Sequence, residues 1–134
     1  VKDGMDIALC KIQGQTLEYS GANNPLWIIR DNEIIEIKAN KQPIGKFDAR
    51  IPFDTHKVDL LKGDQVYVFS DGYPDQFGGD KGKKMKTKAF KEILLDVCKK
   101  PMKEQKEILS QKFHEWRGEL EQIDDVCILG VKIN

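Results

Sequence analysis

The sequence lacks two features that define large classes of proteins. It has no run of about 18 apolar residues, the length that a membrane-spanning helix requires. It has no surplus of positive charge either, because 22 Lys and Arg residues are balanced by 22 Asp and Glu residues. A protein that holds nucleic acid through a general basic surface needs such a surplus. We therefore expect neither direct membrane insertion nor nucleic-acid binding.

Cysteine and histidine are scarce, with three and two residues. An odd number of distant cysteines among apolar neighbours is typical of reduced core residues in the cytoplasm. This expectation applies to Cys10, Cys98 and Cys127. Neither histidine has a partner at the spacing of metal ligands. The sequence leaves open whether a longer protein carries a membrane anchor outside these residues.

Length and composition indicate one folded domain. The chain has 134 residues, of which 40% are hydrophobic and 33% are charged, as in a compact domain with a charged surface. It begins at Val1 without an initiator methionine and soon enters an apolar stretch, Met5 to Cys10. We therefore expect residues 1–134 to form a single unit cut from a longer protein.

The first half of the chain predicts β-strands. Asp31-Asn32 between two β-rich runs is typical of a two-residue hairpin turn. The run Gln65–Phe69 is apolar on both faces, so we expect a strand buried on both sides. The expected strands span residues 7–12, 16–19, 26–30, 33–37, 53–60 and 65–69.

The second half changes to helical periodicity. Apolar residues from Phe90 to Cys98 recur at helical spacing, which predicts a helix over residues 86–99 with Thr87 as N-cap. Pro101 fits the first turn of a second amphipathic helix. Residues 126–133 return to strand character. This order predicts an α+β fold, with two long helices packed on one face of a mostly antiparallel sheet.

Two acidic segments follow or precede predicted strands. Ser70-Asp71-Gly72 comes directly after Gln65–Phe69, and Asp124-Asp125 come directly before the last strand. If those strands are antiparallel neighbours, Asp71 and Asp124 converge at one edge of the sheet. Carboxylates held close together repel each other unless a cation lies between them. Mg²⁺ or Mn²⁺ prefers such oxygen ligands, and two such ions activate water for attack on phosphorus.

A simpler interpretation of the same residues stays open. Ser70-Asp71-Gly72 also fits an ordinary turn, in which glycine allows a sharp change of direction. Asp124-Asp125 also fits a loop cap before a strand. Each short motif is weak by itself.

Several motifs occur together in an order that resembles a known family. They are Gly21-Ala22-Asn23-Asn24-Pro25, Gln42-Pro43-Ile44-Gly45, Gly63-Asp64 leading into Ser70-Asp71-Gly72-Tyr73-Pro74-Asp75-Gln76-Phe77-Gly78-Gly79, and Gln122-Ile123-Asp124-Asp125-Val126. The set resembles the C-terminal part of a SpoIIE-like phosphatase domain, in the metal-dependent type 2C (PPM) serine/threonine phosphatase superfamily. The resemblance extends from about Asp3 to Ile133.

The resemblance implies a fold and a site. The fold is a sandwich of two β-sheets flanked by helices, here in partial form, with two Mn²⁺ or Mg²⁺ ions at one edge. The reaction is removal of phosphate from phosphoserine or phosphothreonine by direct attack of water, without a phosphoenzyme. Asp71 and Asp124 match metal ligands and are the candidate catalytic residues. Gly72, Asp75 and Asp125 are candidates for supporting positions around them.

One departure from the family limits these expectations. An early aspartate and an Asp-x-x-Gly-(His/Lys)-Gly segment, which supply further ligands in relatives, are missing from this sequence. We therefore expect weak metal binding and impaired turnover by the isolated chain.

The expected partner is a phosphorylated regulatory protein of bacterial signal transduction, such as an anti-sigma-factor antagonist. Sheet edges left unpaired favour a homodimer. The alternative is a non-catalytic phosphatase-like module that binds a regulatory protein.

Overall fold

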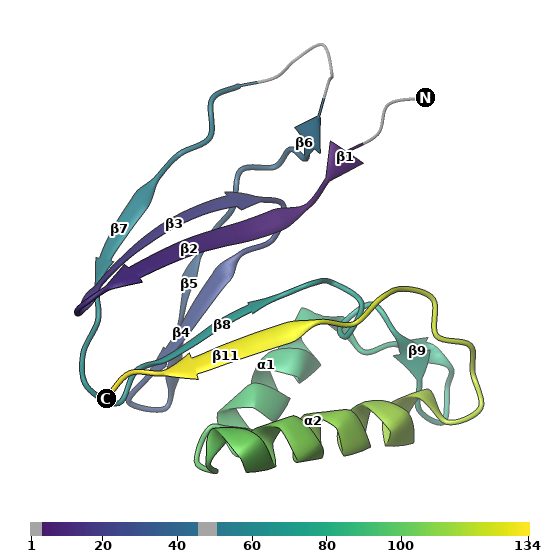
Figure 1. Ribbon diagram of the computed structural model, residues 1–134. Helices are drawn as coiled ribbons and strands as arrows, with labels where there is room; N and C mark the ends of the chain where they lie inside the picture. Colours follow the sequence, from purple (N-terminus) through teal and green to yellow (C-terminus); the bar gives the residue numbers. More distant parts are fainter. Residues whose placement is uncertain (1–3, 46–50) are drawn as a thin grey trace.

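The computed structural model describes residues 4–45 and 51–134 (Figure 1). Asp3, where the family resemblance begins, lies outside these residues. The strands are β1 (Gly4–Met5), β2 (Ile7–Gln13), β3 (Thr16–Ala22), β4 (Leu26–Arg30), β5 (Glu33–Ile37), β6 (Ile44–Gly45), β7 (His56–Asp59), β8 (Gln65–Phe69), β9 (Phe77–Gly78), β10 (Lys83–Lys84) and β11 (Ile128–Lys132). The helices are α1 (Lys86–Val97) and α2 (Met102–Arg117).

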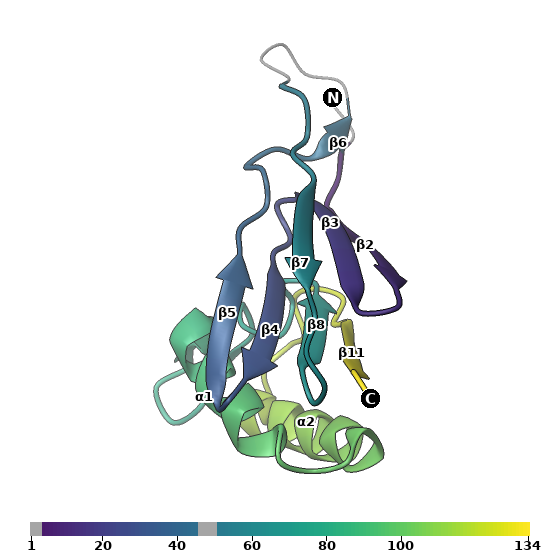
Figure 2. The ribbon, with the colours of Figure 1, turned by 90° about the vertical axis from the view of Figure 1, so that its left-hand side faces the viewer.

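Two antiparallel sheets form the body of the molecule. One has the strand order β11-β8-β4-β5 and the other has the order β2-β3-β7. The two-stranded pairs β1-β6 and β9-β10 lie outside them. Both α1 and α2 lie against one face of the β11-β8-β4-β5 sheet, and the β2-β3-β7 sheet covers the other face (Figures 1 and 2). The predicted α+β fold, a partial sandwich with two helices on one face, is confirmed.

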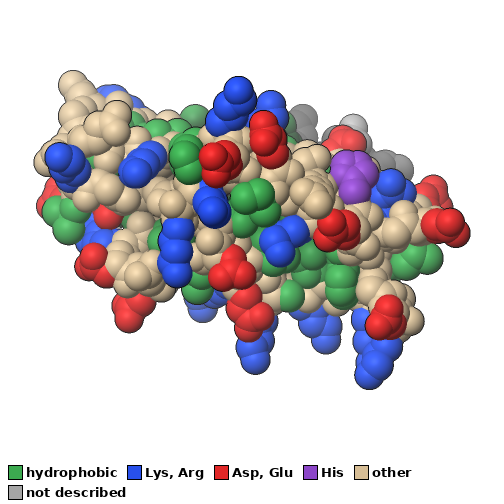
Figure 3. All heavy atoms as spheres, turned by 90° about the horizontal axis from the view of Figure 1, so that it is seen from below, with side chains coloured by type: hydrophobic (Ala, Val, Ile, Leu, Met, Phe, Trp, Pro, Cys, Tyr) green, Lys and Arg blue, Asp and Glu red, His purple; other side chains and the backbone are tan. Residues whose placement is uncertain are grey.

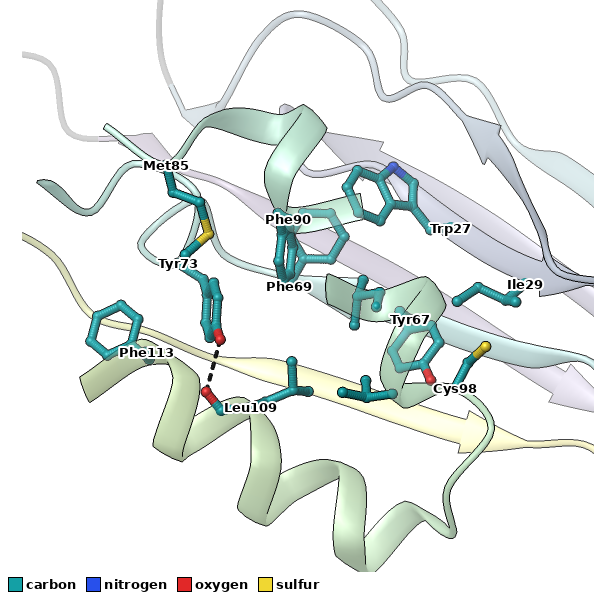
Figure 4. Close-up of a cluster of buried hydrophobic side chains, with 12 residues drawn as sticks. Trp27, Ile29, Tyr67, Phe69, Tyr73, Met85, Phe90, Cys98, Leu109 and Phe113 are labelled. Carbon is teal, nitrogen blue, oxygen red and sulfur yellow. Dashed lines mark hydrogen bonds between the residues drawn. The ribbon is translucent and has the colours of Figure 1, made fainter. Parts of the chain in front are cut away.

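The β8 strand is buried from both sides, as its sequence predicts. Tyr67 and Phe69 point toward the helices, whereas Val66 and Val68 pack between the sheets. The helix-side cluster is rich in aromatic rings: Trp27, Phe69 and Tyr73 surround Phe90, with ring centroids 4.9–5.4 Å from it (Figure 4). Period-2 alternation along β8 thus supplies both layers of the core.

The hairpin β4–β5 forms as predicted. Asp31 and Asn32 both adopt positive φ, 51° and 62°, which matches the twist of the flanking strands. The strand predicted over residues 16–19 extends to Ala22, because β2 pairs with it as far as Ile7 opposite Ala22. Pairing there overrides the turn propensity of the sequence. The strand predicted over residues 53–60 is shorter, because β7 pairs with β3 only from His56 to Asp59.

Two details of the sequence-based prediction are wrong. Thr87 is not the N-cap, because α1 begins at Lys86 and has no side-chain cap. The backbone N–H of Lys86 instead donates to the carbonyl of Pro74 at 2.8 Å, so a tertiary contact replaces the cap. Cys127 is exposed rather than in the core, whereas Cys98 is buried and Cys10 is half-buried. Cys127 lies in the irregular segment before β11.

The surface is mixed in charge. Basic and acidic side chains are interspersed over the face that carries α2 (Figure 3), in keeping with the balanced composition. Within residues 4–45 and 51–134, neither helix has the length and apolar character needed to cross a membrane.

The two sheets are open along one side. The strands β2 and β11 both lie at that side (Figure 2). On β11, Leu129 and Val131 pair with Val68 and Val66 and therefore share their inward-facing side of the sheet. They nevertheless remain 61% and 47% exposed. The inter-sheet core is thus uncovered at the β11 edge.

Candidate functional site

The pairing of β8 with β11 brings the two acidic segments together. These strands are antiparallel, and Ile128 at the start of β11 lies opposite Phe69 at the end of β8. Ser70-Asp71-Gly72 leaves the sheet there, and Asp124–Cys127 enters it at the same edge. The convergence expected from the sequence is therefore present.

Ser70 ties the two segments at the backbone. Its N–H donates to the carbonyl of Cys127 and its hydroxyl donates to the carbonyl of Asp125, both at 3.0 Å. The hydroxyl oxygen also accepts from the N–H of Cys127 at 3.0 Å. The sequence alone predicts no such role for Ser70. The three hydrogen bonds of Ser70 fix the position of the backbone at Asp71 relative to the segment that carries Asp124.

Gly72 is needed for space rather than for an unusual backbone angle. It is not among the glycines with positive φ in the described part of the chain. A Cβ at this position would lie 2.2 Å from the carbonyl oxygen of Asp125, far inside van der Waals contact. The expectation of a turn-enabling glycine is corrected: Gly72 allows the two segments to approach.

The charges at this edge repel one another. The pKa of Asp71 lies above its ordinary value, first because the carboxyl is partly withdrawn from water and then because the carboxylates of Asp75 and Asp124 lie nearby. In its protonated form Asp71 can hydrogen-bond the Asp75 side chain, which raises this pKa further. The backbone N–H of Asp75 also donates to the Asp71 carbonyl at 2.9 Å. Three carboxyl groups therefore share one region of negative potential.

The two remaining candidate residues, Asp125 and Asp75, contribute to the site in different ways. Asp125 contributes its backbone: its carbonyl accepts from Ser70, and its N–H donates to Oδ1 of Asp124 at 2.8 Å. That bond orients the Asp124 carboxylate. Asp75 contributes its side chain, through the interaction with Asp71.

The donor chemistry of this edge fits a hard divalent cation in part. Carboxylate oxygens are the preferred ligands of Mg²⁺ and Mn²⁺, and a cation relieves the repulsion that raises the pKa of Asp71. Across residues 4–45 and 51–134, however, no three His, Cys, Asp or Glu side chains are arranged to hold one ion. The described residues supply some of the ligands of a metal site but not a complete set.

The sequence does not predict the contacts with α2 that hold the chain just after the turn of residues 71–75. Trp116 donates from Nε1 to the carbonyl of Gln76 at 2.8 Å. Gly79 N–H donates to the carbonyl of Trp116 at 2.9 Å, and a Cβ on Gly78 would lie 2.0 Å from that carbonyl oxygen. The only signal in the sequence is the position of Gln76 and both glycines within the motif that contains Asp75.

Comparison with known proteins identifies the family. The sequence model described as Stage II sporulation protein E (SpoIIE) matches residues 4–134. The chain belongs to the SpoIIE family. This membership agrees with the likeness of the chain to a PP2C domain of known structure. The search of curated proteins finds no match.

Solved structures support this assignment. The SiaA-PP2C domain of Pseudomonas aeruginosa superposes with a TM-score of 0.81 at 30% identity, over 90% of this chain and 48% of that chain. The phosphatase domain of SpoIIE from Bacillus subtilis, presoaked with Mn, gives 0.68 at 17% identity, over 98% and 57%. The catalytic domain of the serine/threonine phosphatase PstP, in complex with two manganese ions, gives 0.67 at 15% identity, over 98% and 60%. The last two show the fold alone. This SpoIIE-family chain spans about half the length of these relatives.

Proposed function

We propose that this SpoIIE-family chain is part of a metal-dependent phosphoprotein phosphatase that hydrolyses phosphoserine and phosphothreonine. The observation that carries the proposal is the convergence of Asp71 and Asp124 at the β8–β11 edge, close enough for Asp124 to raise the pKa of Asp71. In this proposal both aspartates are metal ligands and the catalytic residues of the chain.

Mn²⁺ or Mg²⁺ is the proposed cofactor, with two ions in the complete domain. When bound, such ions polarise phosphoryl oxygens and lower the pKa of water. The chain's own residues arrange the ligands: the Asp125 N–H orients the Asp124 carboxylate, and Gly72 lets Asp71 approach it. The Asp75 carboxyl would hold water or an accessory ion beside Asp71. The manganese present in the PstP structure supports this choice of metal.

We propose that residues 1–134 form the C-terminal portion of a larger phosphatase domain. The solved relatives are about twice as long as the matched region. In the described residues no three donors gather around one ion. Both observations support the idea that further metal ligands come from outside this chain, and that the isolated chain turns over slowly.

The proposed substrate is a phosphorylated regulatory protein in the bacterial cytoplasm, such as an anti-sigma-factor antagonist. Similar structures include one that joins the SpoIIE phosphatase domain to a fragment of its regulatory domain, and one of PppA, a key regulatory component of T6SS in Pseudomonas aeruginosa. These support a role in regulation for this chain. The uncovered β11 edge supports a homodimer as its assembly.

A non-catalytic module that binds a regulatory protein is the second candidate. It is favoured by one observation, namely that no three metal donors are gathered in the described residues. Such a module would keep the fold and the partner surface without hydrolysis.

Hydrolysis of an aryl phosphate during Mn²⁺ titration separates the two candidates. The experiment uses the domain of this protein extended to the length of its relatives, alongside the 134-residue chain. We expect Mn²⁺-dependent turnover by the longer domain, which Asp71→Asn and Asp124→Asn abolish. Asp96→Asn, an exposed aspartate on α1, is the matched control and should retain turnover. Activity that survives both site substitutions would overturn the site assignment, and a longer domain without activity would favour the module.

A further inference from the structure

Gln76 occupies an unusual position beside the candidate site. It follows Asp75 directly and is fully buried, with 0% exposure. Its Nε2 donates to the carbonyl of Glu121 at 2.9 Å and to that of Phe77 at 3.0 Å. Glu121 lies three residues before Asp124. One side chain thus links the turn that carries Asp71 and Asp75 to the segment that carries Asp124.

The backbone of Gln76 is tied as well. Its carbonyl oxygen accepts from Nε1 of Trp116 at 2.8 Å and from the N–H of Met85 at 3.0 Å. Trp116 lies in the last turn of α2, and Met85 immediately precedes α1. The position of Gln76 is therefore set by both helices.

The segment that receives the Gln76 side chain has no regular secondary structure. Residues 118–127 form neither helix nor strand. Near the acidic residues it is held by Ser70, which bonds Asp125 and Cys127, and by Gln76, which bonds Glu121. Asp124 lies between these two attachments. With one of them removed, the backbone on one side of Asp124 loses a contact that fixes its position.

The side-chain amide of Gln76 is only half satisfied by hydrogen bonds. In the described part of the chain, Oε1 of Gln76 is buried without a hydrogen-bond partner. A buried acceptor left unpaired destabilises a fold, whereas an apolar side chain of the same size carries no such cost. Methionine has a similar volume and would fill the same space. What methionine cannot supply is the Nε2–H donor that reaches Glu121.

We infer that Gln76 is a positioning residue, which holds Asp124 in a fixed arrangement relative to Asp71 through its bond to Glu121. This inference rests on the proposed function, because it takes the two aspartates as ligands of one cation. Residues that orient metal ligands without touching the metal typically change affinity about 10–100-fold when they are substituted.

Gln105 provides a matched control. It is likewise buried, at 2% exposure, and its Nε2 donates to Gln65 Oε1 and to the carbonyl of Lys100. It lies in the first turn of α2, whereas Gln76 contacts Trp116 in the last turn. The separation of residues 105 and 116 is about 16 Å along the helix axis. Gln105→Met therefore removes a buried amide network far from the acidic edge.

The test measures Mn²⁺ affinity by electron paramagnetic resonance on the full chain, together with amide chemical shifts without metal. Gln76→Met should weaken Mn²⁺ binding at least about tenfold and shift the amides of Asp124 and Asp125. Gln105→Met should do neither. Affinity within about twofold of wild type for a folded Gln76→Met, or an equal loss for Gln105→Met, overturns the inference.

Two other results of this experiment lead to distinct conclusions. If wild type binds no Mn²⁺, the proposed metal site fails in this chain, and the metal-free shifts then decide: movement at Asp124 supports the positioning role, and no movement overturns it. If Gln76→Met does not fold, Trp116→Phe takes its place, because it removes the donor to the Gln76 carbonyl and keeps the ring. Trp116→Phe should give a smaller loss of Mn²⁺ affinity with the same amide shifts, and unchanged shifts overturn the inference.

Discussion

The hydroxyl of Ser70 donates to the carbonyl of Asp125 at 3.0 Å, although the two residues are 55 positions apart. This bond joins the end of β8 to the entry of β11. It places Asp71 and Asp124 on the same edge of the sheet, so two unremarkable acidic segments become one region of negative charge.

Gly72→Ala tests the close approach of the two segments. Its Cβ would lie 2.2 Å from the Asp125 carbonyl oxygen, so the backbone must move apart. We expect a loss of more than about 2 kcal/mol in the free energy of unfolding, measured by urea denaturation, with weaker Mn²⁺ binding. Gly14→Ala is the control: φ is 61° and nothing lies within 4 Å of the new Cβ. It should cost only about 1–2 kcal/mol, and an equal or smaller loss for Gly72→Ala would contradict this account.

The Arg30–Asp64 ion pair gives a pH-dependent contribution to stability. Asp64 is 1% exposed, and Arg30 Nη2 lies 2.6 Å from its Oδ2. The hydrogen bond from Arg30 lowers the pKa of Asp64 below its ordinary 3.8. The unfolded chain therefore binds a proton first as the pH falls, so this stabilisation is present above about pH 4 and is lost as the pH falls through the lower folded-state pKa.

Asp64→Asn should reduce the free energy of unfolding at pH 7 by about 1–3 kcal/mol. The difference from wild type should shrink as the pH falls from about 4 to about 2. Chemical denaturation at a series of pH values measures both effects, and Asp96→Asn should match wild type at pH 7. A difference that grows toward acid pH would show that the sign is wrong.

Phe90→Ala tests the aromatic cluster between the sheet and the helices. Phe90 is fully buried and contacts the rings of Trp27, Phe69 and Tyr73. Truncation leaves a cavity, and we expect a loss of about 3–5 kcal/mol by thermal or urea unfolding. Glu92→Ala, on the exposed face of α1, should stay within about 0.5 kcal/mol of wild type. A loss below about 1 kcal/mol for Phe90→Ala would be inconsistent with this packing.

Leu129→Lys tests the proposed homodimer. Leu129 is 61% exposed although it faces the inter-sheet side of β11, and a lysine on an edge strand discourages pairing with another chain. We expect sedimentation velocity to show concentration-dependent association of the wild-type chain and a shift to monomer in the variant. Leu120→Lys, an exposed leucine after α2, should leave the association unchanged. A wild-type chain that is monomeric throughout would refute this assembly.

The sequence predicts the parts of the fold that depend on local patterns. The two-face burial of Gln65–Phe69 and the positive-φ turn at Asp31-Asn32 follow from alternation and turn chemistry, and both are confirmed. The end of β3 is not predictable in this way, because its last residues are turn formers that remain extended through pairing with β2. The start of α1 is set by the carbonyl of Pro74 rather than by Thr87.

The candidate site is likewise predictable from the sequence only in part. Carboxylates adjacent to strands are visible in the sequence, so Asp71 and Asp124 can be proposed from it. The role of Gly72 is not visible, because its cause is a backbone carbonyl more than fifty residues away. The same holds for Gln76 and Trp116, whose bonds join distant segments. Sequence patterns reveal which groups carry chemistry, while the groups that position them depend on tertiary contacts.

Titration of the ¹⁵N-labelled chain with Mn²⁺, followed by paramagnetic broadening of amide signals, tests most directly whether Asp71 and Asp124 share a cation. The method detects weak binding, which suits a partial ligand set. The amides of residues 70–73, 75 and 123–126 should broaden together at the lowest Mn²⁺ concentrations, and Asp71→Asn or Asp124→Asn should abolish the effect in both segments. Broadening confined to one segment, or first seen at other acidic residues, would contradict a shared site at the β8–β11 edge.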